Sequence, residues 1–351
     1  MRILVTGGAG FIGSTIVDQL VERGHDVVVV DHLHPAAHAT KPDYLNDRAE
    51  YLWCDLRDLD SARGAVRGAD AVCHQASMVG LGVDFADVAN YVTHNDLGTA
   101  QLLCALHESS FAGRLVLASS MVVYGEGAYR CVVHGSVRPR PRHPRDMADG
   151  RFEPTCPVCT SALVPEPVRE NAPLEPRNVY AATKLHQEHL CSAYATEHGA
   201  PLIALRYHNV YGPRMPRNTA YAGVASIFRS AAERGEAPRV FEDGGQRRDF
   251  IHVHDVARAN VLALESPSDV AEALNVATGE PHTVLDMATA LTETIRSGEG
   301  ADAPEIVGGF RPGDVRHITA SPERAAEMLG FRAEVSFDEG MRRFAVDPLR
   351  D

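Results

Sequence analysis

The chain has 351 residues, of which 44% are hydrophobic and 23% charged, a composition typical of a folded globular protein and too apolar for a disordered one. Its net charge of −13 argues against nucleic acid or an anionic membrane as the main partner, because both demand a basic surface. No apolar run approaches the roughly 18–20 residues of a membrane span, and the first residues lack a signal-peptide pattern. Seven cysteines are an odd number, so a disulfide framework is not expected. We therefore expect an acidic, soluble, cytoplasmic protein.

The first 125 residues alternate short β-branched runs with stretches of helical length. Strands are predicted at Ile3–Val5, Asp26–Asp31, Tyr51–Cys54, Ala71–His74 and Leu115–Ala118, and a first helix from about Phe11 to Arg23. Unbroken apolar runs of this kind suit strands that are buried on both faces of a parallel sheet. The alternation predicts a doubly wound α/β fold, in which ligands bind beyond the carboxyl ends of the strands.

A glycine-rich turn separates the first predicted strand from the first helix. It contains Gly7, Gly10, Phe11, Ile12 and Gly13. Such glycines let the backbone approach a pyrophosphate, which the N–H groups of the helix N-terminus then bind, although glycines also serve plain turns. Asp31 strengthens the interpretation, because an acid at the end of the second strand accepts hydrogen bonds from the adenosine ribose and repels a 2′-phosphate. The combination predicts NAD rather than NADP as cofactor.

The ends of the next strands supply further candidate cofactor contacts. Asp55 follows the third strand, from where its carboxylate can reach the adenine amino group or, alternatively, cap the next helix. Small residues after the fourth strand leave room for a cofactor, although the same place could be a tight turn. The candidates at these strand ends are His32, Asp55, Leu56, Gln75, Ala76 and Ser77.

A tyrosine and a lysine four residues apart form the candidate catalytic pair. Tyr180 and Lys184 share one face of a predicted helix that runs to Ala195. A free tyrosine has a pKa near 10, and a nearby lysine, together with a positive nicotinamide ring, lowers that pKa by stabilising the phenolate. Ser120, after the fifth strand, is placed to bind the same substrate oxygen. Alone, this spacing is more often a solvated helix face, but behind an NAD site it predicts a catalytic base.

Taken together, these motifs resemble the extended short-chain dehydrogenase/reductase family, and within it the NAD-dependent nucleotide-sugar epimerases and dehydratases of the UDP-glucose 4-epimerase type. The resemblance covers most of the chain. Besides the glycine turn and the Tyr180/Lys184 pair, it rests on Asp31, Asp55-Leu56, Asn95–Thr99, Ser119–Gly125, Arg206–Pro213, Arg248–Val253 and Arg311–Asp314. It implies a Rossmann domain with a smaller C-terminal substrate lobe, and usually a homodimer formed through two helices per subunit, here about Asp84–His107 and Tyr180–Ala195.

The resemblance also implies roles for individual residues. Tyr180 is the base, Lys184 its partner and Ser120 the residue that binds the sugar oxygen. Asn95 and Tyr207 join Tyr180 and Lys184 as cofactor contacts, and His208 either lines the nicotinamide end or packs in the interior. The residues assigned to a UDP- or dTDP-linked sugar are Ser120, Met121, Asn209, Phe241, Arg248 and Arg311.

The assignments for the nucleotide agree with side-chain chemistry. Arginines such as Arg248 and Arg311 match the geometry of a diphosphate in a bidentate way. Phe241 either stacks on the nucleotide base or belongs to the core of the lobe.

Two positions distinguish between the reactions of this family. The 4,6-dehydratases that the chain resembles carry an Asp-Glu pair directly after the serine or threonine, and this chain has Met121 and Val122 there. Neither side chain transfers a proton, and the glutamate of related decarboxylases is also missing. The remaining chemistry is reversible oxidation at one carbon, which predicts a 4-epimerase. A 4-ketoreductase or dehydrogenase of the same sugars, or a non-catalytic NAD-binding sensor, are the alternatives.

An unusual segment rich in Arg, Pro, His and Cys lies between residues 125 and 173. Its centre, Arg138–Arg145, is expected to form neither a regular helix nor a central strand. Around it lie two pairs with metal-ligand spacing, Cys131 with His134 and Cys156 with Cys159. They predict a closed structural zinc site, the alternative being three surface thiols and an imidazole together by chance. The insertion, which is similar to that of chains of the dTDP-L-rhamnose 4-epimerase type, is expected to form one wall of the sugar pocket.

The sequence therefore predicts three structural parts. The Rossmann domain is expected at residues 1–125, completed by 174–210 and 250–278; the inserted element at 126–173; and the substrate lobe at 211–249 and 279–351.

Overall fold

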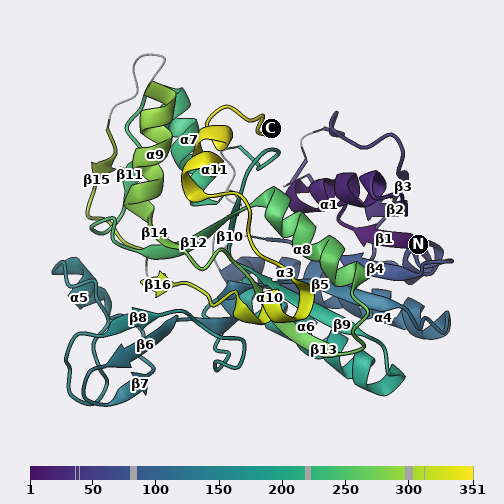
Figure 1. Ribbon diagram of the computed structural model, residues 1–351, viewed down its shortest axis with the longest axis horizontal. Helices are drawn as coiled ribbons and strands as arrows, with labels where there is room; N and C mark the ends of the chain where they lie inside the picture. Colours follow the sequence, from purple (N-terminus) through teal and green to yellow (C-terminus); the bar gives the residue numbers. More distant parts are fainter. Residues whose placement is uncertain are drawn as a thin grey trace.

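The computed structural model describes residues 1–35, 37–38, 40–79, 85–217, 223–296, 303–311 and 313–350. Its centre is a seven-stranded parallel sheet with the order β13-β9-β5-β4-β1-β2-β3 (Figure 1). The strands are β1 Arg2–Thr6, β2 Asp26–Asp31, β3 Glu50–Trp53, β4 Ala71–His74, β5 Arg114–Ser120, β9 Leu202–Tyr207 and β13 Ala271–Val276. The predicted doubly wound parallel sheet is confirmed.

Helices cover both faces of this sheet, which explains why its strands are apolar throughout. In β1, Ile3 and Val5 pack on one face and Leu4 on the other. The first face carries α1 Phe11–Glu22, α8 Val253–Glu265 and α10 Glu323–Leu329, and the second carries α2 Leu59–Ala65, α4 Gly98–Glu108 and α6 Val179–His198. Residues 279–351 were expected to belong to the lobe, but α10 packs on the central sheet. The chain therefore returns from the lobe to the sheet before its end.

The strand order reverses at β1, and this reversal positions the candidate site. The chain runs outward from β1 through β2 to β3, and then crosses to β4 on the other side of β1. The carboxyl ends of β1 and β4 therefore diverge into a crevice. Thr6 holds this crevice together, since its hydroxyl accepts hydrogen bonds at 3.1 Å from the backbone N–H groups of Gln75 and Ala76.

A continuous helical segment follows β4 and the residues outside the described ranges. It consists of η1 Phe85–Asp87, α3 Val88–Tyr91 and the π-helical turn η2 Val92–Leu97, which leads directly into α4. The start of the helix predicted from Asp84 lies outside the described residues. In the described ranges, none of the helices combines the length and the apolar character that a bilayer crossing requires.

The smaller lobe lies beside the carboxyl edge of the sheet, at the upper left of Figure 1. Its strands are β10 Asn209–Tyr211, β12 Arg247–His252, β14 Pro281–Thr283 and β16 His317–Ile318, with the pair β11 Arg239–Val240 and β15 Glu305–Ile306. Helices α7 Val224–Glu233, α9 Val284–Arg296 and α11 Phe337–Phe344 enclose a core that includes Phe228, Phe250 and Phe344.

The inserted element is a small unit of its own, at the lower left of Figure 1. It contains the antiparallel strands β6 Ala128–Cys131, β7 Gly135–Val137 and β8 Val164–Glu166, and the short helix α5 Pro144–Ala148. Tyr129, Cys131, Cys156 and Leu163 form its core. Residues 138–143 form neither helix nor strand, as expected for Arg138–Arg145, and α5 begins only at the last two residues of that segment. Pro144 is tolerated because it lies in the first turn, where its missing N–H costs no hydrogen bond, and the His143 side chain caps the helix.

Candidate active site

A cavity of 1210 Å³ extends from the glycine turn to the loops of the lobe. It exceeds the roughly 300–1,000 Å³ of a pocket for one drug-sized ligand, so it can hold a cofactor together with a substrate. All the predicted cofactor and substrate residues lie on its wall except Asn95 and Ser120.

The glycine turn is packed so tightly that side chains are excluded at two of its positions. Gly7 has a φ of +68°, and a Cβ there would lie 2.8 Å from the backbone of Ala76. A Cβ at Gly13 would lie 2.2 Å from the carbonyl oxygen of Gly7. This packing brings the N-terminus of α1, capped by Gly10, to the cavity wall. Its free N–H groups and helix dipole fit the pyrophosphate of a dinucleotide.

Asp31 is fixed at the end of β2 by backbone hydrogen bonds. Its carboxylate accepts one from Ala9 N–H at 3.1 Å and one from Leu33 N–H at 2.8 Å. The acid therefore faces the cavity in one orientation beside the glycine turn, as a ribose contact requires.

The structure decides between the two interpretations of Asp55. Helix α2 is capped by Asp58, whose carboxylate accepts a hydrogen bond from Ser61 N–H at 3.0 Å, so Asp55 does not cap it. Asp55 instead pairs with Arg57 at 2.6 Å, and the hydrogen bonds from Arg57 lower the pKa of its carboxyl to about 2. An ionised acid on the cavity wall can accept a hydrogen bond from an adenine amino group.

Asn95, a predicted cofactor contact, makes its hydrogen bonds with the protein itself. The Asn95 side chain is fully buried in η2. Its oxygen accepts a hydrogen bond from Met78 N–H at 2.7 Å, and its nitrogen donates to the Thr183 hydroxyl at 2.9 Å. Asn95 therefore ties the loop after β4 to α6 from behind the cavity wall.

The end of β5 brings the predicted catalytic residues together. Helix α6 begins at Val179 because the Asn178 side chain accepts a hydrogen bond from Ala181 N–H at 2.8 Å. This start places Tyr180 against Ser120, with which it forms a side-chain hydrogen bond. One turn later, Lys184 donates a hydrogen bond to the carbonyl of Ala118 at 2.8 Å.

The protein alone does not prepare Tyr180 as a base. Burial raises the pKa of its phenol to about 12, and the hydrogen bond with Ser120 offsets only part of this shift. Burial also lowers the pKa of Lys184 to about 7. Among the protein's own groups, desolvation is therefore the largest influence on the pKa of Tyr180. The positive ring of an oxidised nicotinamide is the charge that would favour the phenolate.

The β9 end of the cavity is held by a small hydrogen-bond cluster. The Tyr207 hydroxyl donates to Asn260 at 2.9 Å and to Gln75 at 3.1 Å. His208 is both 4% exposed and on the cavity wall, and burial lowers its pKa to about 3, so it is neutral. Beside it, the side-chain oxygen of Asn209 is buried and unpaired within the described structure.

Three predicted nucleotide-binding side chains meet at the lobe end. The Arg311 guanidinium lies over the ring of Phe241, 5.5 Å from its centre. Phe241 is half-buried on the cavity wall, outside the lobe core, which favours the base-stacking interpretation. Arg248 is aimed into the cavity by hydrogen bonds to the carbonyls of Val315 at 2.8 Å and Arg316 at 2.9 Å. Pro312, within the Arg311–Asp314 segment, lies outside the described residues.

Some wall residues carry no motif and are absent from the sequence prediction. His34 and His94 join the predicted His32 there, and one nitrogen of each of the three lies within 4.8 Å of the others, although His94 is 60 residues beyond His34 in sequence. Arg350 reaches the wall from the last strand-like segment of the chain, whose backbone pairs with Met215 at 3.2 Å. Only the tertiary fold brings these residues to the cavity.

The four predicted metal ligands, Cys131, His134, Cys156 and Cys159, come together in the inserted element. Cys131 Sγ lies 3.6 Å from both His134 Nδ1 and Cys159 Sγ, and Cys156 Sγ lies 3.5 Å from His134 Nδ1. A tetrahedral zinc ion with Zn–S bonds of about 2.3 Å separates its sulfur ligands by about 3.8 Å. The cluster therefore has the size of a zinc site.

The expected wall of the sugar pocket is not formed by the insertion. In the described structure, no residue between 126 and 173 lines the cavity. Figure 1 shows the β-hairpin of the insertion pointing away from the central sheet. Side chains of the insertion that contact the lobe include Arg142 and Glu153.

Comparison with known proteins agrees with this geometry. A sequence profile described as the NAD dependent epimerase/dehydratase family matches residues 3–145 and 157–277. The chain belongs to this family. The gap in the match, residues 146–156, falls inside the inserted element, where it begins within α5 and ends at Cys156, so the family pattern does not include that stretch.

Individual members of the epimerase/dehydratase family are similar over nearly the whole chain. A dTDP-L-rhamnose 4-epimerase of Burkholderia thailandensis is 32% identical over 97% of this chain and 93% of the relative. The structure of the Thermus thermophilus UDP-glucose 4-epimerase in complex with NAD is 32% identical, with a TM-score of 0.78 and 98% of both chains covered. The Thermotoga maritima UDP-glucose 4-epimerase with UDP-glucose is 30% identical, with a TM-score of 0.78 and 98% and 97% of the chains covered.

Proposed function

We propose that the protein is an NAD-dependent nucleotide-sugar 4-epimerase that acts on a UDP- or dTDP-linked sugar. The observation that carries this proposal is the hydrogen bond between Ser120 and Tyr180, because Tyr180 lies on the wall of one continuous cavity. That cavity has a dinucleotide cradle at one end and Phe241, Arg248 and Arg311 at the other. The reacting pair thus lies between a hydride acceptor and the residues that would hold the nucleotide.

The side chains account for the proton transfers at the sugar C4. Bound NAD supplies a reversible hydride acceptor at this position. Tyr180 takes the proton of the C4 hydroxyl, while Ser120 holds the same oxygen as it becomes a ketone. The volume of the cavity allows the 4-keto sugar to rotate, so that its opposite face is presented to the nicotinamide. Tyr180 then returns the proton to the oxygen after hydride has re-entered from the opposite face.

The distribution of acids argues against a dehydratase. The carboxylates described on the cavity wall belong to Asp31 and Asp55, at the ends of β2 and β3, and to Glu242 and Asp314, on lobe loops. Beside Ser120 the wall carries Met121 and Val122. Elimination of water requires an acid and a base at the sugar ring, and these side chains supply neither.

The test is turnover without added cofactor. Purified protein is incubated with UDP-glucose, UDP-galactose and dTDP-L-rhamnose, and the products are identified by NMR. An epimerase recycles one bound NAD, whereas a 4-ketoreductase or dehydrogenase of the same sugars consumes cofactor stoichiometrically. A requirement for added NAD(P)H would assign the protein to that alternative class, and no turnover of any sugar would favour a binding protein.

Solvent deuterium separates epimerisation at C4 from deprotonation beside a ketone. In D₂O, hydride return keeps the original hydrogen at C4. Deuterium at C3 or C5 of the product would instead indicate 3,5-epimerisation and overturn the proposal.

We also propose that Cys131, His134, Cys156 and Cys159 bind one structural zinc ion. Four protein ligands leave no open position for catalytic water. The separations of 3.5–3.6 Å support the assignment, as does the small core of the insertion, which needs a further constraint. Elemental analysis of tag-free protein tests it, and a zinc content at background level would refute it.

The assembly and cellular location are further proposals. Helices α4 and α6 lie side by side on one face of the sheet, and the exposed Val92 and Leu97 of η2 lie next to them, so this face suits a homodimer. All seven cysteines are free, which suits a reducing cytoplasm. Light scattering tests the dimer: a monomeric mass would contradict it.

A further inference from the structure

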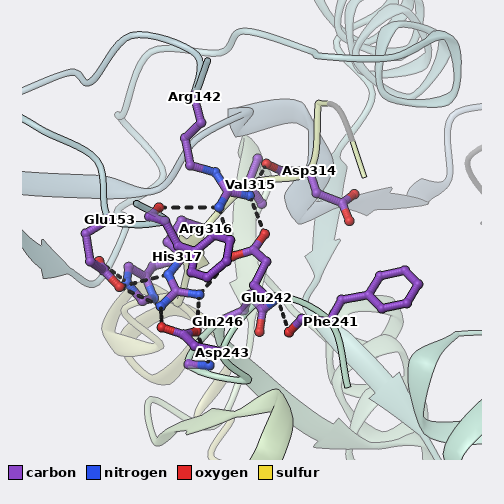
Figure 2. Close-up of polar contacts among 12 residues, drawn as sticks. Arg142, Glu153, Phe241, Glu242, Asp243, Gln246, Asp314, Val315, Arg316 and His317 are labelled. Atoms are coloured by element: carbon purple, nitrogen blue, oxygen red, sulfur yellow. Dashed lines mark hydrogen bonds and ion pairs between the residues drawn. The ribbon is translucent and has the colours of Figure 1, made fainter. Parts of the chain in front are cut away.

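The inserted element reaches the nucleotide end of the cavity through buried charges rather than through its surface. Arg142, from the segment between the two metal-ligand pairs, has a side chain only 5% exposed. Its guanidinium makes a two-pronged contact with Glu242, at 2.8 Å and 2.9 Å, and Glu242 itself is only 2% exposed. The same guanidinium donates to the carbonyl of Asp314 at 2.7 Å. Figure 2 shows Arg142 bridging these two loops of the lobe.

A second arginine extends the network to the other side of Glu242. Arg316, 2% exposed, donates to Glu242 at 2.8 Å and to both carboxylate oxygens of Asp243 at 2.8 Å and 2.9 Å. It also donates to Glu153 of the insertion at 2.8 Å, and Glu153 bonds to His317 at 2.9 Å (Figure 2). The insertion therefore contributes one buried cation, Arg142, and one half-exposed anion, Glu153, to a charge cluster that is otherwise made by the lobe.

The two loops held by this cluster are those that carry the nucleotide-binding side chains. Phe241 directly precedes Glu242, and Arg311 lies three residues before Asp314. The carbonyls that aim Arg248 belong to Val315 and Arg316, in the second loop. Each of the three side chains thus depends on backbone that the insertion fixes.

The backbone at Glu242 needs such a constraint. Its φ is +55°, a left-handed conformation that is costly for a residue other than glycine or asparagine. Its N–H donates to the Gly309 carbonyl at 2.7 Å, and its carboxylate is held by Arg142 and Arg316. Loss of one of the two cations would leave a buried carboxylate undercompensated, and the loop would relax toward solvent.

We propose that Arg142 and Glu153 are positioning residues for the nucleotide-diphosphate end of the cavity. They act through Glu242 and Arg316 to hold Phe241, Arg248 and Arg311 in the geometry that binds the nucleotide. The inserted element thereby sets the affinity for the nucleotide sugar without touching it. This inference rests on the proposed function, because it takes the lobe end of the cavity as the nucleotide site.

The test compares Arg142→Met, which keeps an unbranched apolar stem but removes the guanidinium with its charge and donors, with Arg140→Ala, a change at an exposed arginine of the same segment. Calorimetry measures the binding of UDP and dTDP to enzyme that retains its NAD. We expect Arg142→Met to weaken the better-bound nucleotide about tenfold or more and to raise KM by a similar factor, with kcat and NAD content nearly unchanged. Arg140→Ala should behave as the wild type.

Arg142→Lys is the control for a loss of affinity that is caused only by misfolding. It keeps the charge but not the two-pronged geometry, so its nucleotide affinity should fall between the wild type and Arg142→Met. Unchanged nucleotide affinity in both variants would overturn the inference, as would a loss of kcat and NAD in parallel with affinity. Wild-type protein that binds neither UDP nor dTDP would instead overturn the proposed function itself.

Discussion

The two ends of the cavity are built on different principles. At the cofactor end, the glycine turn, Asp31 and Gln75 each follow a strand of the central sheet directly, and they are held by short contacts to neighbouring backbone. At the nucleotide end, four segments that lie far apart in sequence meet through side-chain charges, as with Arg142 and Glu242, which are 100 residues apart. The cofactor end is therefore held by backbone contacts at the strand ends, and the nucleotide end is held by ion pairs between distant segments.

This difference implies that the two binding events can be perturbed separately. Changes in the inserted element should alter nucleotide affinity and leave the cofactor in place, whereas changes in the glycine turn or in Asp31 should do the reverse.

The largest effect is expected for Tyr180→Phe, which removes the base between the two ends. Because the phenol is the proton acceptor for the C4 hydroxyl, kcat should fall by roughly 10³-fold or more. NAD content and nucleotide affinity should both persist, since neither end of the cavity is altered. Steady-state kinetics and cofactor analysis decide, and a variant with more than about a tenth of wild-type activity would exclude the assignment.

Asp31→Ala should affect the cofactor end only. Loss of a carboxylate that can bind ribose hydroxyls and repel a 2′-phosphate should narrow the preference for NAD over NADP by about 10–100-fold. Binding of each cofactor to cofactor-free protein is measured by fluorescence titration, with UDP or dTDP affinity as the control that stays constant. Wild-type protein that binds both cofactors equally well would contradict this role of Asp31.

Cys156→Ser should affect the nucleotide end only. Opening the metal cluster loosens the element that carries Arg142, so nucleotide affinity should fall about tenfold, while NAD is retained. The exposed Cys104 lies outside the insertion, and Cys104→Ser is the matched control. Adding Arg142→Met to Cys156→Ser should cause little further loss, because both changes act through one network. Fully additive losses would show that the two act independently.

The smallest effect is a change in acid stability at Glu153. Burial alone would raise the pKa of Glu153, but hydrogen bonds from His317 and Arg316 outweigh it and lower the pKa from 4.5 to about 2. A carboxyl with a lowered folded-state pKa stabilises the protein above its unfolded pKa, and this contribution disappears as the pH falls from 4.5 through 2. Glu153→Gln should therefore be less stable than the wild type at pH 7, and the difference should vanish near pH 2.

Urea denaturation at several pH values measures this difference. The exposed Glu197→Gln on α6 is the control and should follow the wild type throughout. A gap between Glu153→Gln and the wild type that persists unchanged at pH 2 would refute the electrostatic explanation.

The sequence predicts best where a signal is local. The strands, the glycine turn and the Tyr180/Lys184 spacing depend on neighbours within a few residues, and the structure has the predicted strands and helix in those places. The metal ligands are also found together, because two short spacings bring each pair close and only one loop must close. The sequence predicts less well where burial decides, as in Asn95, whose motif is found but whose side chain lies behind the wall.

Long-range electrostatics escape prediction from one sequence. Nothing in the Arg/Pro-rich segment distinguishes Arg142, which is buried, from the exposed Arg140. The pairing depends on how the insertion sits on the lobe, and that is fixed by residues from 242 to 317. The same limitation explains why the insertion was expected to line the sugar pocket when it acts from behind the nucleotide loops.

The residues of the ion network around Arg142 are synthesised at different times, because its partners lie far away in the sequence. All four proposed metal ligands have been synthesised once the chain reaches residue 159, but the partners of Arg142 lie 100 and 172 residues after it. At about 5–20 residues per second, Glu242 emerges roughly 5–20 s after Arg142, and Asp314 roughly 9–34 s after it. During that interval the nascent insertion has a core of its own but no partner for its cation. A metal ion captured early would keep the element folded until the lobe arrives, so zinc supply during translation should influence the yield of the native enzyme.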